Sequence, residues 1–302
     1  AGAPAVYEAS FSADGVFAAV DILERLGEGW GIIEVKSTTQ VKPEHVQDAA
    51  VQAHVLERSG LDVRRVEVMH LNRACTYPDL SDLFTRADVT EQVSGLLPEV
   101  PGNVSAMRDA LDRPCPEVPI GPHCSTPYEC PFRSRCWKGV PYRPANERQR
   151  LALAEDRLVV EPTLRKALEP FAPPLAFLDF ETVNPAVPVW DGCHPYDLVP
   201  VQFSCHRQDS DGALEHVEWL ADGPGDPRPA VAGAVLEACA GARGVVVYNA
   251  SFEKTRLKEL GAALGGETAR ALEDVASRVL DLLPVVRNHV YHPAFGGSFS
   301  LK

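Results

Sequence analysis

The sequence of 302 residues has no long uninterrupted apolar run, no recognisable secretion signal and no excess of basic residues. Without an apolar run of about 18 residues there is no candidate membrane-spanning helix, so no membrane partner is expected. Without a signal peptide the chain is predicted to be soluble and cytoplasmic. Lysine and arginine number 29 against 42 aspartates and glutamates, a formal net charge of −13. This balance argues against non-specific coating of nucleic acid, because phosphate contacts need basic side chains.

The length permits two domains, and an apolar fraction of 45% suits globular cores. The first residue is not methionine, and the last six residues, Gly-Ser-Phe-Ser-Leu-Lys, stop within a patterned segment, so we expect both ends to be incomplete. No secretory context supports disulfides. The eight cysteines are therefore predicted to serve a metal ion or an iron–sulfur cluster where they gather.

The most informative stretch is Gly31–Ser37, which reads Gly-Ile-Ile-Glu-Val-Lys-Ser. It is typical of a mostly buried strand on which Glu34 and Lys36 share one face, because they are two residues apart. Val16–Leu23 reads as the strand before it, with Asp21 near its end. Two such carboxylates can hold Mg²⁺ or Mn²⁺ through oxygen, while the lysine orients a water or neutralises a pentavalent phosphate. The alternative for Glu-x-Lys alone is a surface ion pair.

An aspartate and a Glu-x-Lys on adjacent strands, followed by a helix, resemble the core of the PD-(D/E)XK nucleases, especially the RecB-like branch. The following helix is predicted to run from Pro43 to about Arg58. In RecB-like nucleases this helix bears a glutamine and often a tyrosine near the metal. Gln52 takes the place of the glutamine, and His54 stands where the tyrosine is expected. Glu8 is a further candidate carboxylate, with an exposed strand residue as the alternative.

The rest of the first half is predicted to complete a compact core. Ala5–Phe11 and Val63–Asn72 alternate like strands of the same sheet. Residues 83–112 are predicted to be helical and connecting, with breaks at Pro98 and at Pro101-Gly102.

Three cysteines, Cys124, Cys130 and Cys136, follow at equal spacing with prolines and aromatic residues between them. A tight loop of this kind is predicted to bring three thiolates to one centre. Zinc requires four ligands, with His123 or Cys115 as the fourth, and a [4Fe–4S] cluster requires a fourth thiolate. The run resembles the cysteine cluster of iron–sulfur RecB-like nucleases, whose first cysteine lies upstream of the core. The resemblance implies a structural staple, with the missing ligand before the first residue or supplied by Cys115.

The segment 139–174 is predicted to link two halves. It contains an amphipathic helix over Asn146–Glu155 and a second helical pattern over Val159–Phe171. The predicted domains are therefore 1–138, the linker, and 175–302.

The second half opens with Leu175–Thr182, an apolar strand that contains Asp179-Phe-Glu181. Alternation places both carboxylates on one face, where two metal ions can be shared. This resembles the first motif of the DEDD 3′–5′ exonucleases, which have an RNase H-like fold. The following elements are predicted to be two strands, a helix and a third strand, at Pro200–His206, Leu214–Leu220, Pro229–Ala240 and Gly244–Tyr248.

The stretch Asn249-Ala-Ser-Phe-Glu253 resembles the second exonuclease motif, with glutamate where that class usually has aspartate. The alternative for Glu253 is a residue that the helix dipole favours at a helix start. No fourth carboxylate is evident before Lys302, and it is expected beyond the end of this chain. Asp281 is predicted to lie on a helix and to support the fold.

The order of these motifs, with residues 177–188, Pro195-Tyr196 and Tyr291–Lys302, resembles a bacterial family known as a domain of unknown function. The resemblance implies an α/β chain in which a PD-(D/E)XK nuclease core with a cysteine cluster precedes an RNase H-like mixed-sheet domain. We expect from it a metal-dependent nuclease acting on DNA, single-stranded or at duplex ends, with RNA also open. The resemblance does not imply a biological pathway, and DNA repair or defence is our guess. The alternatives are a nucleic-acid-binding module with degenerate sites and a structural metal cluster, and a redox sensor.

Overall fold

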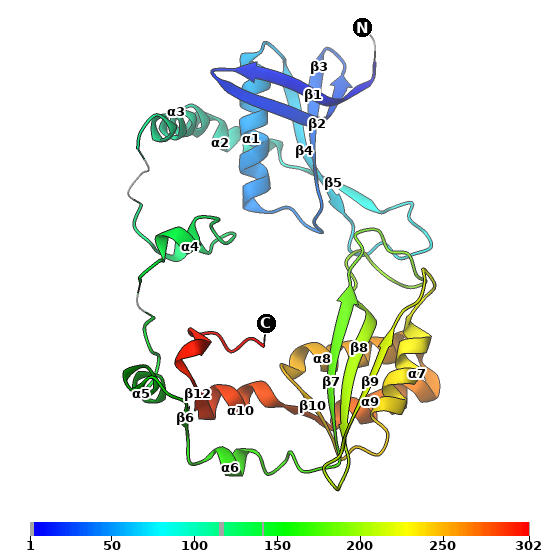
Figure 1. Ribbon diagram of the computed structural model, residues 1–302. Coiled ribbons are helices and arrows are strands. Elements are labelled where there is room, and N and C mark those ends of the chain that lie inside the picture. Colours follow the sequence, from blue (N-terminus) through cyan, green and yellow to red (C-terminus); the bar gives the residue numbers. More distant parts are fainter. Residues whose placement is uncertain (1–2, 115–117, 141, 302) are drawn as a thin grey trace. The chain divides into compact units, whose positions relative to one another are not determined.

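The computed structural model describes residues 3–114, 118–140 and 142–301, and the chain divides into two compact units (Figure 1). The first unit comprises residues 1–123 together with 185–196, and the second comprises 124–184 and 197–302. Both main sheets mix parallel and antiparallel neighbours, so the chain has an α/β fold, as predicted. Within the described ranges, no helix has the length and apolar content that crossing a membrane requires.

The first unit contains a five-stranded sheet in the order β1-β2-β3-β4-β5. Its strands are β1 (Ala5–Ala13), β2 (Val16–Leu26), β3 (Gly29–Lys36), β4 (Val63–Leu71) and β5 (Phe84–Asp88). All neighbours are antiparallel except β3 and β4. These two are parallel because a helix, α1 (Pro43–Arg58), carries the chain back between them.

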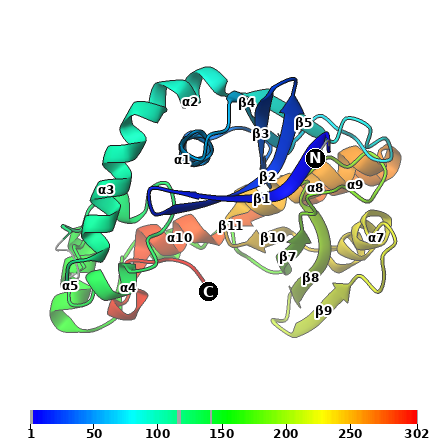
Figure 2. The ribbon, with the colours of Figure 1, turned by 90° about the horizontal axis from the view of Figure 1, so that it is seen from above.

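Helix α1 packs against the sheet and has the bounds that the sequence predicts. Figure 2 shows it end-on beside the strands. Its buried face includes Ala49, Ala50 and Ala53 together with Val55 and Leu56. The buried cluster includes Val20, Leu23, Ile32, Ala49, Ala50, Ala53, Leu56, Val66 and Val68. This packing fixes the polar side chains of α1 relative to β2 and β3.

The prediction for residues 83–112 is wrong in two respects. Phe84–Asp88 is a strand, which pairs antiparallel with β4. Pro101 does not break a helix but lies in the first turn of α3 (Val100–Leu111), where the missing proline N–H costs nothing. The other helical elements here are α2 (Thr90–Leu96) and a 3₁₀ turn at Leu97–Glu99.

The second unit contains a sheet in the order β11-β10-β7-β8-β9. Its strands are β7 (Leu175–Val183), β8 (Val199–Gln208), β9 (Leu214–Leu220), β10 (Gly244–Val247) and β11 (Val279–Asp281). The first three form an antiparallel meander, and β10 and β11 run parallel to β7. The predicted strands and their order are confirmed.

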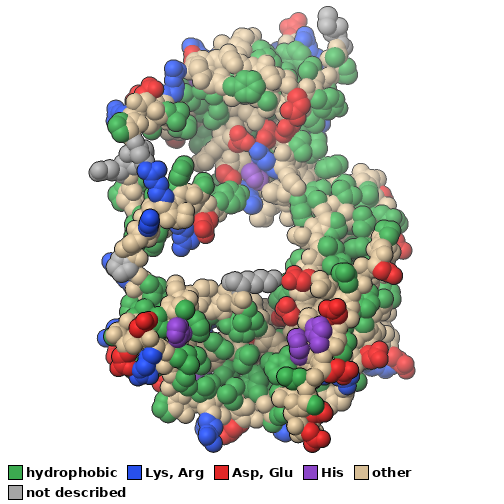
Figure 3. All heavy atoms as spheres, viewed as in Figure 1, with side chains coloured by type: hydrophobic (Ala, Val, Ile, Leu, Met, Phe, Trp, Pro, Cys, Tyr) green, Lys and Arg blue, Asp and Glu red, His purple; other side chains and the backbone are tan. Residues whose placement is uncertain are grey.

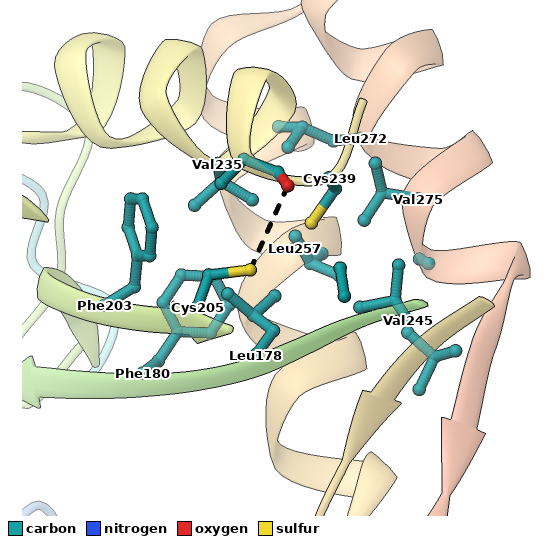
Figure 4. Packing of buried hydrophobic residues seen from close by; sticks show 14 of the residues in the cluster. Leu178, Phe180, Phe203, Cys205, Val235, Cys239, Val245, Leu257, Leu272 and Val275 are labelled. Atoms are coloured by element: carbon teal, nitrogen blue, oxygen red, sulfur yellow. Dashed lines mark hydrogen bonds between the residues drawn. The ribbon is translucent and has the colours of Figure 1, made fainter. Parts of the chain in front are cut away.

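Three helices, α7 (Arg228–Ala238), α8 (Ala250–Leu264) and α9 (Gly266–Ser277), cover one face of this sheet. Figure 4 shows that the core side chains of β7 and β8 point into these helices, with Cys205 Sγ 3.9 Å from the Ala238 oxygen. The packed residues include Leu178, Phe180, Phe203, Cys205, Val235, Leu257, Leu272 and Val275. The alternate residues of β7 and β8 therefore project from the other face.

The segment between the cysteine run and β7 has less helix than predicted. Helix α5 (Glu147–Glu155) is confirmed, with the Asn146 side chain accepting a bond from Gln149 N. Over 159–171 the only helix is α6 (Leu164–Ala167), because Val159–Val160 forms a strand, β6, paired with β12 (Val290–Tyr291). The remaining elements are α4 (Arg133–Cys136), α10 (Leu282–His289) and 3₁₀ turns at Pro122–Cys124 and Pro293–Phe295.

Candidate active sites

Asp21 and Glu34 lie opposite each other on β2 and β3. The antiparallel register pairs Ile22 with Ile33, which places position 21 against position 34. Asp21 Oδ2 accepts a 2.7 Å hydrogen bond from the backbone N–H of Val35. The register of one tight hairpin thus brings together two carboxylates that are 13 positions apart.

Glu34 is only 6% exposed, and each of its oxygens has a partner. Oε1 lies 2.7 Å from Lys36 Nζ, and Oε2 accepts a 2.6 Å bond from Gln52 Nε2 on α1. The amide oxygen of Gln52 is buried and has no hydrogen-bond partner. A buried oxygen without a donor is costly, so this atom is available to a cation or a water.

Burial raises the pKa of Glu34 above its ordinary value. The hydrogen bonds from Lys36 and Gln52 oppose this rise, and the charge of Asp21 adds to it. The proton is therefore held more tightly than in an exposed glutamate. A cation beside Glu34 and Asp21 would favour their ionised forms.

Lys36 is held between two carboxylates from different elements. Besides Glu34, Asp48 on α1 lies 2.6 Å from Lys36 Nζ. Burial alone would lower the pKa of Lys36, but the hydrogen bonds to Asp48 and Glu34 raise it overall. Lys36 is therefore a fixed cation at neutral pH. From the sequence, Asp48 was not identified as a site residue. It lies four residues before Gln52, on the same side of α1, and that spacing is the signal that could have found it.

Two other candidates of the first half lie in different surroundings. Glu8 falls opposite Asp21 in the β1–β2 register, where its φ of 53° interrupts the ladder, and its side chain is exposed. His54 lies with Nε2 3.6 Å from Asp14 Oδ2 at the β1–β2 turn. The side chains that bond to the Glu34 carboxylate are instead Lys36 and Gln52.

The segment Pro185–Tyr196 belongs to the first unit although it joins β7 to β8. Tyr196 N donates to the Pro185 oxygen, which closes the segment into a loop. The Tyr196 hydroxyl lies 2.5 Å from Ser37 Oγ and donates to the Ser37 oxygen at 2.8 Å. Tyr196 therefore holds the residue that follows Lys36, a contact that the sequence did not reveal.

In the second unit, Asp179 and Glu181 are exposed on the sheet face that α7, α8 and α9 do not cover. They stand opposite Ser204 and Gln202 of β8. The shared face follows from strand alternation, as the sequence predicts.

Glu253 lies in the first turn of α8 and is 3% exposed. Its Oε2 is buried and has no hydrogen-bond partner. Burial, with the charges of Asp179 and Asp281, raises the pKa of Glu253 to about 7. The helix start thus carries a carboxyl group that faces other carboxylates and retains its proton near neutral pH.

The prediction that Asp281 lies on a helix is wrong. It ends β11 and caps α10, because a short apolar strand cannot be distinguished from a helical segment by periodicity. Its carboxylate accepts three backbone N–H bonds, from Asn249 at 3.1 Å, Ala250 at 3.0 Å and Leu283 at 3.0 Å. Asp281 therefore fixes the start of α8, the helix that presents Glu253.

We expect Asp281→Ala to lower the free energy of unfolding by about 2 kcal/mol, because three backbone donors lose a charged acceptor. Hydrogen exchange should show the largest increase at the start of α8. The matched control is Asp274→Ala, which removes only a surface ion pair with Arg278 and should change stability by less than about 0.5 kcal/mol. Equal protection of α8 in both variants would contradict this role.

The cysteine run does not form a ready metal site in the described residues. Cys124 is buried, Cys130 is half-buried and Cys136 is exposed. Cys130 N donates to the Cys124 oxygen at 2.9 Å, so the turn between them is compact. Cys115 lies outside the described residues. The zinc ion or [4Fe–4S] cluster stays a prediction.

A cavity of about 380 Å³ adjoins Asp179 in the second unit. Its apolar lining comes from β7, β10, α10 and residues 295–301, and its polar lining includes Ser204, His206 and Tyr248. The Tyr248 hydroxyl donates to the Phe299 oxygen at 2.5 Å. The lining places an apolar hollow beside an exposed carboxylate.

In chemical terms, both carboxylate sites suit a hard divalent cation, which binds oxygen. Each also contains a buried oxygen without a partner, on Gln52 and on Glu253. Over the ranges that the structure describes, however, no three His, Cys, Asp or Glu side chains already form a group that could hold a metal ion. The donors are thus of the right kind, and they are not preassembled.

Comparison with curated proteins found no match to this chain. A family comparison did find one. Residues 176–300, which include Asp179, Glu181, Glu253 and Asp281, match a family described as a domain of unknown function, DUF2779.

Proposed function

We propose that this protein is a metal-dependent nuclease that hydrolyses phosphodiester bonds of DNA at two separate sites. The observation that carries the proposal is the convergence of Asp21, Glu34 and Lys36 with Gln52 around one buried carboxylate. An ordinary surface ion pair between Glu34 and Lys36 would require neither a buried carboxylate nor a hydrogen bond from the Gln52 amide. On this proposal the first unit is a RecB-like PD-(D/E)XK nuclease core, and the second is an RNase H-like, DEDD-type exonuclease domain.

In the first site, Asp21, Glu34 and the free amide oxygen of Gln52 would hold Mg²⁺ or Mn²⁺, which would supply positive charge to the phosphate and a more acidic water. Lys36 keeps its charge because Asp48 and Glu34 surround it. It is therefore suited to orient a water or to stabilise charge that grows on the phosphate oxygens. Asp48 positions the ammonium group and need not touch the substrate.

In the second site, Asp179, Glu181 and Glu253 would share the metal ions. Glu253 has to lose its proton for this, and its raised pKa ties that loss to pH. Asp281 holds the start of α8 through Asn249 and Ala250 and so positions Glu253.

The reaction is the same at both sites. A water oxygen forms a bond to phosphorus, the bond from phosphorus to one ester oxygen breaks, and the departing oxygen takes up a proton. The products are a phosphomonoester and a free hydroxyl group. An exonuclease of the second kind would trim 3′ ends, whereas the first site can cut from either end or internally.

We expect Lys36→Ala and Asp179→Ala each to remove one product pattern when end-labelled DNA is incubated with Mn²⁺. Each should slow its own reaction by about 100-fold or more, because each removes a charged group at the reacting phosphate. The assay uses single strands and duplexes labelled at either end, with RNA as a parallel substrate. Exposed Glu267→Gln is the control and should leave both patterns unchanged.

If the wild-type protein binds every substrate but leaves it intact, the nuclease proposal fails. A binding module with degenerate sites then takes its place. If RNA is cut and DNA is not, the reaction stands and the substrate class changes.

A further inference from the structure

The exposed face of the second sheet carries an aromatic row next to the carboxylates. In the β7–β8–β9 register, Phe177 stands opposite His206, and His206 stands opposite His216. The next row, two residues along β7, is Asp179, Ser204 and Glu218. Because these positions alternate with core residues, all of them project from the same face. The two rows therefore lie side by side on one surface.

The row is accessible. His206 and His216 are exposed, and Phe177 is half-buried beside them. The two imidazole rings lie with centroids 4.5 Å apart. Figure 3 shows histidine side chains next to acidic side chains on the surface of this part of the chain. In contrast, Leu178 and Cys205, which point the other way, are buried in the core.

The row continues into the cavity beside Asp179. Phe177 and His206 line that cavity together with Asp179 and Ser204. A ligand lying along the row would thus reach the proposed reaction centre without leaving the surface. Rings that are spaced by neighbouring strands of a sheet are a known support for unpaired bases.

We propose that Phe177, His206 and His216 form a stacking platform for the bases of a single-stranded nucleic acid whose 3′ end lies at Asp179 and Glu181. The proposal rests on the proposed function of the second site. It makes single strands, or unpaired 3′ ends, the substrate of that site. A duplex keeps its bases stacked on one another and would not use the row.

The charges favour bases over phosphates on this row. Glu218 Oε2 lies 3.3 Å from His216 Nε2, and Asp179 and Glu181 are nearby on the same face. Acidic side chains repel a phosphate backbone but not the face of a base. A transition-metal site is the other reading of paired histidines, but these residues are not among any described group of three metal-binding side chains.

The test measures 3′ trimming of a single-stranded 12-mer by the Lys36→Ala variant, in which only the second site would cut. Adding His206→Ala and His216→Ala should raise KM about tenfold for each ring removed and leave kcat within about twofold. Replacing two bases near the 3′ end by abasic sites should raise the KM of the Lys36→Ala parent by the same factor. In the variant that also carries His206→Ala and His216→Ala, the abasic sites should raise KM no further. His216→Phe should restore KM, because a phenyl ring stacks without charge.

The matched control is Glu215→Ala, the exposed neighbour of His216 on β9 that projects from the other face. It should leave KM unchanged. If the histidine variants and the abasic strand trim with the parent KM, the platform is wrong and the nuclease stands. If His216→Phe fails to restore KM while His216→Ala raises it, the ring acts by charge and the stacking proposal is overturned.

If no trimming occurs at all, binding decides the question. Fluorescence anisotropy of the labelled 12-mer in Ca²⁺ should show the same tenfold losses with the histidine variants and the abasic strand. In that case the second site is not a nuclease and the platform stands. Equal affinity of every variant for the intact and abasic strands would overturn the platform as well.

Discussion

Glu34→Gln should slow cleavage at the first site by about 100-fold or more and leave the fold intact. The amide matches the shape of the carboxylate and removes the charge that a cation and Lys36 require. Burial raises the pKa of Glu34, so the folded protein favours its ionised form less than the unfolded chain does. The variant avoids the free-energy cost of burying a charge, but it also loses the charge-assisted hydrogen bond to Lys36, and the two effects offset each other. We expect the free energy of unfolding to stay within about 1 kcal/mol of wild type.

The matched control is Glu67→Gln on the neighbouring strand β4. Glu67 is also buried, but it stands beside Ile33 in the register and pairs with Arg65 and Arg86. Its substitution should cost about 1.5 kcal/mol of stability, because charge-assisted bonds are weakened. Cleavage should not change. The interpretation of Glu34 would be wrong if its substitution destabilised the protein as Glu67→Gln does and left first-site cleavage unaffected.

Glu253 should make the stability of the metal-free protein fall as the pH rises towards neutrality. Burial, followed by the charges of Asp179 and Asp281, raises its pKa from 4.5 to about 7. Between these values the folded state holds more protons than the unfolded state, so the free energy of unfolding decreases with pH. The contribution is fully present below pH 4.5 and is lost as the pH passes 7. Its size is about 3 kcal/mol.

Glu253→Gln should remove this dependence. Urea unfolding in EDTA at pH 5 and pH 8 would compare the two proteins, and the wild type should lose about 3 kcal/mol more than the variant over that range. The control, Glu267→Gln on exposed α9, should behave like the wild type. Parallel pH profiles of wild type and Glu253→Gln would show that Glu253 titrates normally.

Divalent cations should reverse the decrease in the free energy of unfolding that occurs as the pH rises. Binding of Mn²⁺ to the ionised carboxylate stabilises the folded state, and protons compete with the ion for Glu253. Mn²⁺ should therefore raise the unfolding free energy of the wild type more at pH 8 than at pH 5. In Glu253→Gln the benefit should be smaller and nearly independent of pH. This measurement needs no cleavage and so tests the site separately from the reaction.

The local features could be predicted from the sequence. Alternation along a strand is set by the backbone, so Glu34 and Lys36 had to share a face, as did Asp179 and Glu181. The bounds of α1 followed from its proline start and its alanine-rich apolar side. The strands β7, β8, β9 and β10 and the helix α7 of the second unit followed from the same rules. Each of these depends only on neighbours within one element.

Where local patterns competed with tertiary pairing, they failed. Val159–Val160 reads as helical but forms a strand, because Tyr291 pairs with Val159 and is completely buried beside it. Asp281 reads as part of a helix, yet β10 draws the preceding residues into a sheet. A short apolar run has no preferred structure of its own, so the nearest partner decides.

The surroundings of the charged groups depend on how the elements pack together. The contacts of Lys36 with Asp48 and of Glu34 with Gln52 require α1 to pack at one angle on the sheet. The loop that ends in Tyr196 returns to Ser37 across about 160 positions of sequence, as the separation of 159 shows. Burial and the approach of like charges, which give Glu253 its pKa near 7, are properties of packing between elements. No periodicity along the chain encodes them.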